Sequence, residues 1–205
     1  MSVLVPLPTG AAEINFSLPR RAAFVVKSGY SPKQTVIDRG SILDGWRASL
    51  SIVPNDDMRP WRAWMAAMLG PVNFTDLETV ITPQVASLTN PTISAVTSPA
   101  QITLTGLPES QTGYLKAGAL MTIYTGASST KPRLVTLLAD ASSSAAGTGV
   151  VLFDPPIGGL VTGRVCVVRV PFCRMNLAPP FSLGYALGLA EISQPAPIDL
   201  VELVE

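Results

Sequence analysis

Residues 45–53 read GWRASLSIV, and this stretch decides the fold class. Every second position is apolar and belongs to one face of an extended strand: Trp46, Ala48, Leu50 and Ile52. The positions between them are polar: Arg47, Ser49 and Ser51. This alternation predicts a strand with one buried and one solvated face, which is the pattern of an antiparallel sheet. Pro54 ends the strand because proline cannot donate to a sheet ladder.

The segment after this strand predicts a helix. Asp56 and Asp57 are suited to cap its first turn, Pro60 is compatible with that turn, and Gly70 ends it. Its apolar residues recur at three- and four-residue spacing and form one stripe: Met58, Trp61, Trp64 (or Met65), Met68 and Leu69. We expect the stripe to pack on the sheet, and a Trp- and Met-rich surface for a partner is the alternative.

The rest of the chain predicts short strands separated by turns. The stretches with strand character are 24–26, 80–81, 92–93, 102–104, 120–124, 133–138, 150–153 and 163–170. Four prolines, at 83, 91, 99 and 108, limit residues 71–112 to turns and edge strands. Residues 139–149 are small and polar, so they predict a mobile loop. The pattern is that of a mainly β protein.

Composition excludes several function classes. The 205 residues include 14 Lys and Arg, 14 Asp and Glu, and no His, and only 14% are charged. A hydrophobic fraction of 47% is too high for a disordered chain. Zero net charge argues against a nucleic-acid surface, and the absence of His excludes imidazole bases and His metal ligands. So few charges indicate that much of the surface is covered by other subunits.

Neither a membrane segment nor a secretion signal is predicted. No stretch approaches the run of about 18 apolar residues that spans a bilayer. Pro6 and Pro8 interrupt an N-terminal stretch that also lacks a basic start, so it does not resemble a signal peptide. Cys166 and Cys173 form no C-x-x-C motif, and we expect two buried thiols, with a disulfide or redox pair as the alternative.

The residue types that support catalysis do not form a recognisable site. The acidic candidates for a carboxylate pair are Asp44, Asp56, Asp57, Asp76, Asp140 and Asp154. Asp56 and Asp57 are better interpreted as helix caps, and Asp154, before two prolines, as a turn residue. Gly126, Gly147 and Gly149 fit no dinucleotide fingerprint. We therefore assign no catalytic, cofactor-binding or metal-binding residue and expect that the chain is not an enzyme.

The order of the motifs resembles a known family. WRASLSI at residues 46–52 is followed by PNDDMRPWRAWMAAMLG at 54–70 and VNF at 72–74. GYLKAGALMTIY at 113–124, RLVT at 133–136 and GTGVVLFDPP at 147–156 come next, then FSL at 181–183 and LAEI at 189–192. This series is similar to the distal tail proteins, the tail-tip or baseplate ring proteins of long-tailed siphovirus-type bacteriophages. Ala119 departs from family patterns that have an acidic residue after the glycine.

The resemblance implies a fold, a role and partners. It implies a β-sandwich belt domain with one helix, formed by residues 1–80 plus 165–205, and an inserted small β-barrel of oligonucleotide-binding-like shape at 81–164. The expected role is that of a virion structural protein, a homo-oligomeric ring that links the tail tube to the tail tip or baseplate. The expected partners are further copies in a hexameric ring, the tail tube protein and the hub or fibre proteins. Neither nucleic acid nor membrane is expected as a partner.

The resemblance also implies a location in the virion tail, with assembly in the cytoplasm of the bacterial host. Two alternatives stay open. One is another tail-tip or head–tail connector component. The other is a carbohydrate-binding β-sandwich, in which Trp46, Trp61 and Trp64 would be platforms for sugar rings. Sugar binding requires at least one exposed Trp beside polar groups, whereas we expect all three in the core.

Overall fold

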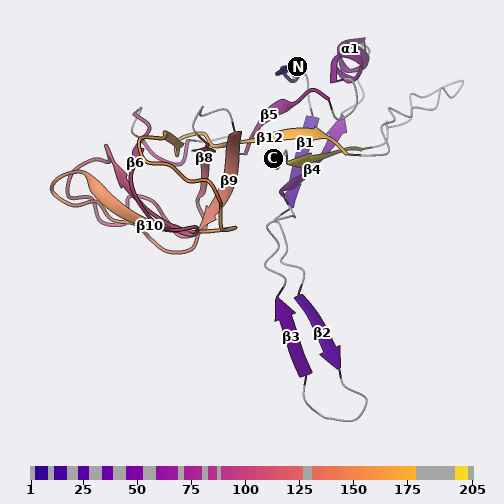
Figure 1. The fold of residues 1–205 in the computed structure, drawn as a ribbon. Coiled ribbons are helices and arrows are strands. Elements are labelled where there is room, and N and C mark those ends of the chain that lie inside the picture. The colour runs from indigo at the N-terminus through magenta and orange to yellow at the C-terminus, as the bar shows by residue number, and fades with distance from the viewer. Residues whose placement is uncertain are drawn as a thin grey trace, which may run out of the picture.

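The computed structural model describes residues 3–8, 12–17, 23–27, 34–38, 45–52, 59–68, 72–79, 83–86, 89–126, 131–178 and 197–202. The predicted mainly β class is confirmed, because strands outnumber helices throughout the described chain (Figure 1). In chain order the elements are β1 (Ala12–Ser17), β2 (Ala23–Lys27), β3 (Gln34–Asp38), β4 (Arg47–Ile52), α1 (Arg59–Met68), β5 (Thr75–Glu78), β6 (Thr92–Ser98), β7 (Gln101–Thr105), β8 (Leu120–Thr125), β9 (Lys131–Leu137), β10 (Thr148–Asp154), β11 (Cys166–Val167), β12 (Phe172–Leu177) and β13 (Ile198–Glu202). None of the described helices is long and apolar enough to cross a membrane.

A five-stranded antiparallel sheet joins the two ends of the described chain. Its strand order is β1-β4-β13-β12-β5, so β13 lies between β12, the preceding strand, and β4, which comes much earlier in the sequence. The inner face of β4 is buried at Trp46, Ala48 and Leu50, as the alternation predicts. Leu200 of β13 continues this face because it pairs in register with Ala48. These residues form the first of two hydrophobic cores.

Helix α1 covers this core (Figure 1). Trp61, Trp64 and Met68 are its buried residues, which confirms that the predicted stripe packs on the sheet. The rings of Trp61 and Trp64 meet edge to face, with centroids 6.0 Å apart. Pro60 lies in the first turn, where its missing N–H is not needed. The predicted capping and terminal residues, Asp56, Asp57 and Gly70, lie outside the described residues, as do Met58 and Leu69 of the stripe.

Residues 89–167 form a small antiparallel barrel. Its strand order is β11-β8-β9-β10-β7-β6. The two outer strands meet through the bridge between Thr92 and Val165, and Ile93 donates its N–H to the Arg164 carbonyl at 2.8 Å. The sheet therefore closes on itself around a second core, which includes Ile102, Phe153 and 14 further buried residues. A small barrel agrees with the fold class that the resemblance implies, and its ladder includes β11.

The strands of the barrel depart from the sequence prediction in two places. Residues 101–105 were expected at a sheet edge, but β7 is a central strand between β6 and β10. The prolines fall between strands, where they interrupt no ladder. The long strand expected at 163–170 is reduced to β11, and beyond it the Arg169 carbonyl accepts a hydrogen bond from the Gln84 N–H, outside a regular ladder.

The predicted mobile loop at residues 139–149 is also wrong. Ala141 exchanges two backbone hydrogen bonds with Leu115, and the Ser143 hydroxyl accepts a bond from the Gln111 N–H at 2.9 Å. Ala141 and Ser143 are buried. Gly147 has φ +64°, and a Cβ there would lie 2.5 Å from the Leu107 carbonyl oxygen. Small residues are therefore needed because the loop packs closely against residues 107–117.

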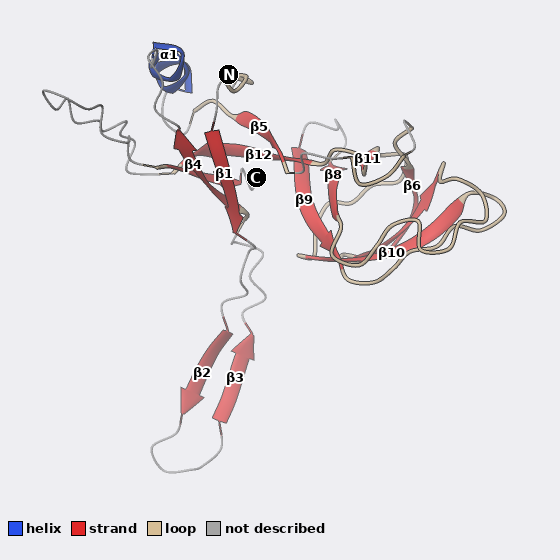
Figure 2. Cartoon of the chain, turned by 180° about the vertical axis from the view of Figure 1, so that it is seen from behind, coloured by secondary structure: helices blue, strands red, loops and turns tan. Residues whose placement is uncertain are grey.

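The hairpin of β2 and β3 is a separate two-stranded sheet. The ladder runs from the pair Ala23–Asp38 to the pair Lys27–Gln34. Neither strand pairs with either larger sheet. Figures 1 and 2, which view the molecule from opposite sides, both show the hairpin projecting away from the barrel and the five-stranded sheet.

Candidate functional site

The acidic residues weighed as catalytic candidates do not converge. Asp76 forms a bidentate pair with Arg174, at 2.8 Å for each bond. Asp140 binds Lys116 in the barrel, and Asp154 ends β10. The other three acidic candidates, Asp44, Asp56 and Asp57, lie outside the described residues. Among the residues that the structure describes, no three His, Cys, Asp or Glu side chains gather as metal ligands would.

The charge pairs Asp140–Lys116 and Asp76–Arg174 differ in their exposure to solvent. At the exposed pair, the Ala117 N–H and then the Lys116 ammonium lower the pKa of Asp140. Arg174 is more enclosed, and its hydrogen bonds to Asp76 raise the pKa of the guanidinium. Its cation also lies 4.2 Å from the centre of the Phe74 ring. Since each charge is already neutralised by a partner, these groups serve the fold.

Both cysteines are buried and free, as expected. Cys166 belongs to the barrel core and Cys173 to the core of the five-stranded sheet. Burial raises the pKa of Cys166 to about 12. Burial also raises the pKa of Cys173, and the nearby Glu202 carboxylate adds to the effect. A thiol that stays protonated at neutral pH is a poor nucleophile and a poor metal ligand.

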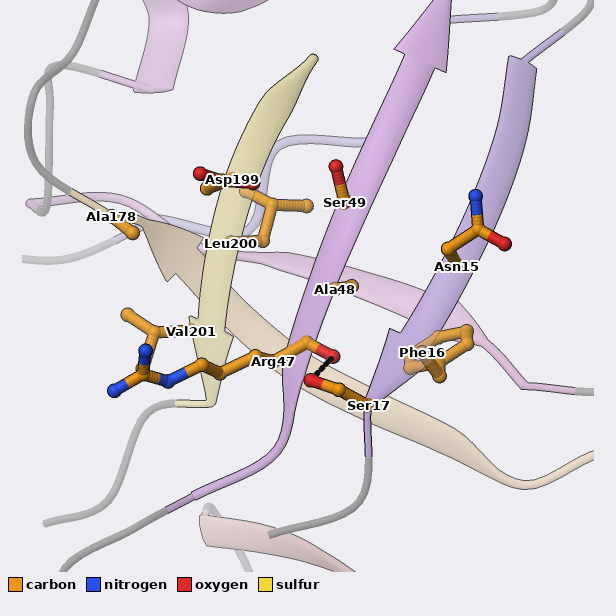
Figure 3. A pocket seen from close by; sticks show the side chains of 10 residues that line it. All are labelled: Asn15, Phe16, Ser17, Arg47, Ala48, Ser49, Ala178, Asp199, Leu200 and Val201. Atoms are coloured by element: carbon orange, nitrogen blue, oxygen red, sulfur yellow. Dashed lines mark hydrogen bonds between the residues drawn. The ribbon is translucent and has the colours of Figure 1, made fainter.

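A concavity lies on the solvated face of β1, β4 and β13 (Figure 3). Its volume is about 580 Å³. The strand registers align its polar side chains in rows across the sheet. One row runs from Asn15 to Ser49 to Asp199, and the next contains Ser17 and Arg47. The cavity therefore offers amide, hydroxyl, carboxylate and guanidinium groups together.

This cavity suits binding rather than bond cleavage. Among the described lining residues, Arg47 and Asp199 are exposed and carry opposite charges. The Ser17 hydroxyl donates to the Arg47 carbonyl at 3.2 Å, so it is occupied by the backbone. No activated nucleophile with an adjacent base is formed by these residues. The alternation at 45–53 predicts the solvated face of β4, but nothing in the sequence indicates that β13 completes the cavity.

A second exposed surface lies on the barrel. Val150 and Leu152 are 51% and 42% exposed, and both belong to the outward face of β10. Leu138 is adjacent because its N–H donates to the Leu152 carbonyl at 2.9 Å, and it is 60% exposed. We call these three residues the barrel patch. Exposed apolar side chains that cluster in this way often mark a contact with another protein.

The three tryptophans do not reach either surface. Trp46, Trp61 and Trp64 are at most 3% exposed. The Trp46 indole N–H donates to the Leu134 carbonyl at 2.8 Å, inside the protein. The expectation that all three belong to the core is therefore confirmed. None of them can stack on a sugar ring in this structure.

Comparisons with known proteins give no family assignment. The sequence matches no model of a protein family and no curated protein. Any functional assignment therefore depends on the residues and geometry described above, together with the resemblance in motif order.

Proposed function

We propose that this chain is a virion structural protein that forms a ring of identical subunits and links a phage tail tube to the tail tip or baseplate. The observation that carries the proposal is the β2–β3 hairpin, which stands apart from both sheets. A two-stranded hairpin alone is marginal in water, because it buries too little apolar surface to offset the entropy of ordering. A neighbouring subunit would supply the missing contact.

Two other features support an assembly role. β1 pairs only with β4, so among the described strands its outer edge has no partner. Open edges recruit further strands unless they are protected. In addition, only 14% of the residues are charged, and charge is depleted at the centres of protein interfaces. Head-to-tail contacts between two different surfaces, repeated by rotation, produce a closed ring.

The first alternative within the same class is another tail-tip or head–tail connector component. It shares the assembly role and differs only in the neighbours. The carbohydrate-binding alternative is less well supported, because all three tryptophans are buried. Titration of the intrinsic fluorescence with host polysaccharide tests it, and a saturable change would favour it.

Negative-stain electron microscopy of the purified full chain tests the proposed ring. We expect annular particles of one diameter with a central opening. Addition of purified tail tubes should place such a ring at one tube end. Particles of open or variable curvature, or association along the whole tube, would contradict a ring that joins the tube to the tip.

A further inference from the structure

Glu202 is a charged residue in the interior of the molecule. Its side chain is fully buried. One carboxylate oxygen accepts hydrogen bonds from Arg133 Nε and from the Leu134 N–H, both at 3.1 Å. The other accepts from the Trp46 N–H at 3.0 Å. Arg133 and Leu134 belong to β9 of the barrel, whereas Trp46 precedes β4 of the five-stranded sheet.

The carboxylate therefore connects the two sheets. A buried charge is very costly unless donors surround it. Two of its three donors come from the barrel, so the charge is satisfied only when the barrel lies in its observed position. Trp46 strengthens the link, since its indole N–H donates to the carbonyl of Leu134. Leu134 itself is fully buried and belongs to the core of the five-stranded sheet.

Further links between barrel and sheet lie at β12. The Thr122 hydroxyl accepts from the Phe172 N–H at 2.8 Å and donates to the Phe172 carbonyl at 2.6 Å. The rings of Tyr124 and Phe172 meet edge to face, 6.2 Å apart. These contacts lie close to the point where the chain passes from β11 to β12, so they resemble a hinge. Glu202 is 68 residues distant from Leu134 in sequence and fixes the second point of attachment.

We propose that Glu202 is a conformational latch, which holds the barrel in one orientation on the five-stranded sheet. When the carboxylate is removed, Leu134 leaves the core of the sheet and the barrel pivots at β12, while the rest of each core stays folded. Through the contacts of Glu202, a movement of the barrel is transmitted to the five-stranded sheet. It does not depend on ring formation.

The two cysteines report on the latch separately. Cys173 lies in the sheet core, where the Glu202 and Arg133 charges act on it. Cys166 lies in the barrel core. Trypsin cleavage after Arg169 places the two thiols in different peptides. Mass spectrometry therefore measures the alkylation rate of each cysteine without mutation of the other.

The experiment is pulsed alkylation of the full chain carrying Glu202→Gln. We expect alkylation of Cys173 to be about tenfold faster, because loss of a charged bond between buried partners is worth a factor of this order. Since the Glu202 charge also acts on the Cys173 thiol directly, a faster reaction without a larger radius of gyration would overturn the proposal. Alkylation of Cys166 should be unchanged. Small-angle scattering should show a larger radius of gyration. Asp140→Asn removes an exposed charge pair within the barrel and should change neither thiol.

Equal acceleration of both thiols would overturn the proposal, because it would indicate general loss of stability. Unchanged rates for both would overturn it as well. Trp46→Phe is the milder variant should Glu202→Gln fail to fold. It removes the indole bond to Leu134 and part of the ring volume in the sheet core, and we expect Cys173 alone to react about fivefold faster.

Discussion

The barrel and the five-stranded sheet differ in how the backbone groups of their outer strands are paired. In the barrel, Thr92 and Val165 form a bridge pair, and hydrogen bonds from Ile93 to Arg164 and from Cys166 to Pro91 flank it, so both outer strands have two neighbours. Among the described strands, the five-stranded sheet does not close, and β1 pairs only with β4. The barrel interior is filled by one core, whereas the sheet is covered by α1 on one face and has a polar concavity on the other.

Under the proposed ring, this difference predicts which surfaces would meet a neighbouring subunit. A closed barrel satisfies its own backbone, so it needs no neighbour in order to fold. The open sheet and the separate β2–β3 hairpin present backbone edges that a neighbouring subunit can satisfy. The following predictions test whether the sheet depends on its helix and on partners, and whether the barrel is self-sufficient.

The largest effect is expected from Trp64→Ala. The side chain is 3% exposed and fills the core between α1 and the sheet. Its loss should lower the free energy of unfolding by about 3–5 kcal/mol. Denaturant unfolding measures this, and Ala63→Ser on the exposed side of the same helix is the matched control. A loss below about 1 kcal/mol would mean that the Trp64 side chain lies on a surface.

Two glycines of the barrel allow a matched comparison. Both have positive φ, but a Cβ at Gly147 would meet the Leu107 carbonyl, whereas Gly118 faces open space. Gly118→Ala should cost about 1–2 kcal/mol, from backbone strain alone. Gly147→Ala should cost about 2–4 kcal/mol, since overpacking is added. Equal losses in thermal unfolding would show that the loop at 139–149 does not pack as described.

The buried thiols predict a loss of stability at high pH. Their folded pKa values are raised above the ordinary 9.0, to about 12 for Cys166. The unfolded chain therefore releases these protons first, and the stabilisation present below about pH 9 is lost as the pH rises. The loss should approach about 1 kcal/mol per thiol for each pH unit. Urea unfolding at about pH 8 and pH 10 measures it. A variant with both cysteines replaced by alanine should lose less of its free energy of unfolding over this pH range. An identical loss would contradict the attribution of this pH dependence to the two thiols.

The smallest effect is expected at the barrel patch. Leu138→Ser should change the free energy of unfolding by less than about 0.5 kcal/mol, because the side chain is 60% exposed. Leu137→Ser, at the neighbouring buried position, is the contrasting variant and should be strongly destabilising. A large effect of Leu138→Ser would place that residue in the core, which the structure does not.

The sequence predicts features that depend on one segment. The alternation at 45–53 and the stripe of Trp61, Trp64 and Met68 are local, and both are confirmed. The predicted edge position of residues 101–105 is wrong because β10, far along the chain, pairs with the second side of β7. The cavity was missed for the same reason.

Glu202 is a different case, because a local signal was present. In IDLVE at residues 198–202, Glu202 follows Ile198 and Leu200 on the same face of the strand. A charged residue at a position that the alternation assigns to the core is a sign of a buried polar contact. Its partners on β9 could be identified only from the structure.

The most direct test of the central claim is the mass of the native particle. Light scattering after size-exclusion chromatography compares the full chain with a variant in which a short turn replaces residues 23–38. We predict one discrete multi-subunit mass for the full chain and monomers with an intact barrel for the variant. A full chain that stays a monodisperse 21.5 kDa monomer at high concentration would contradict the claim.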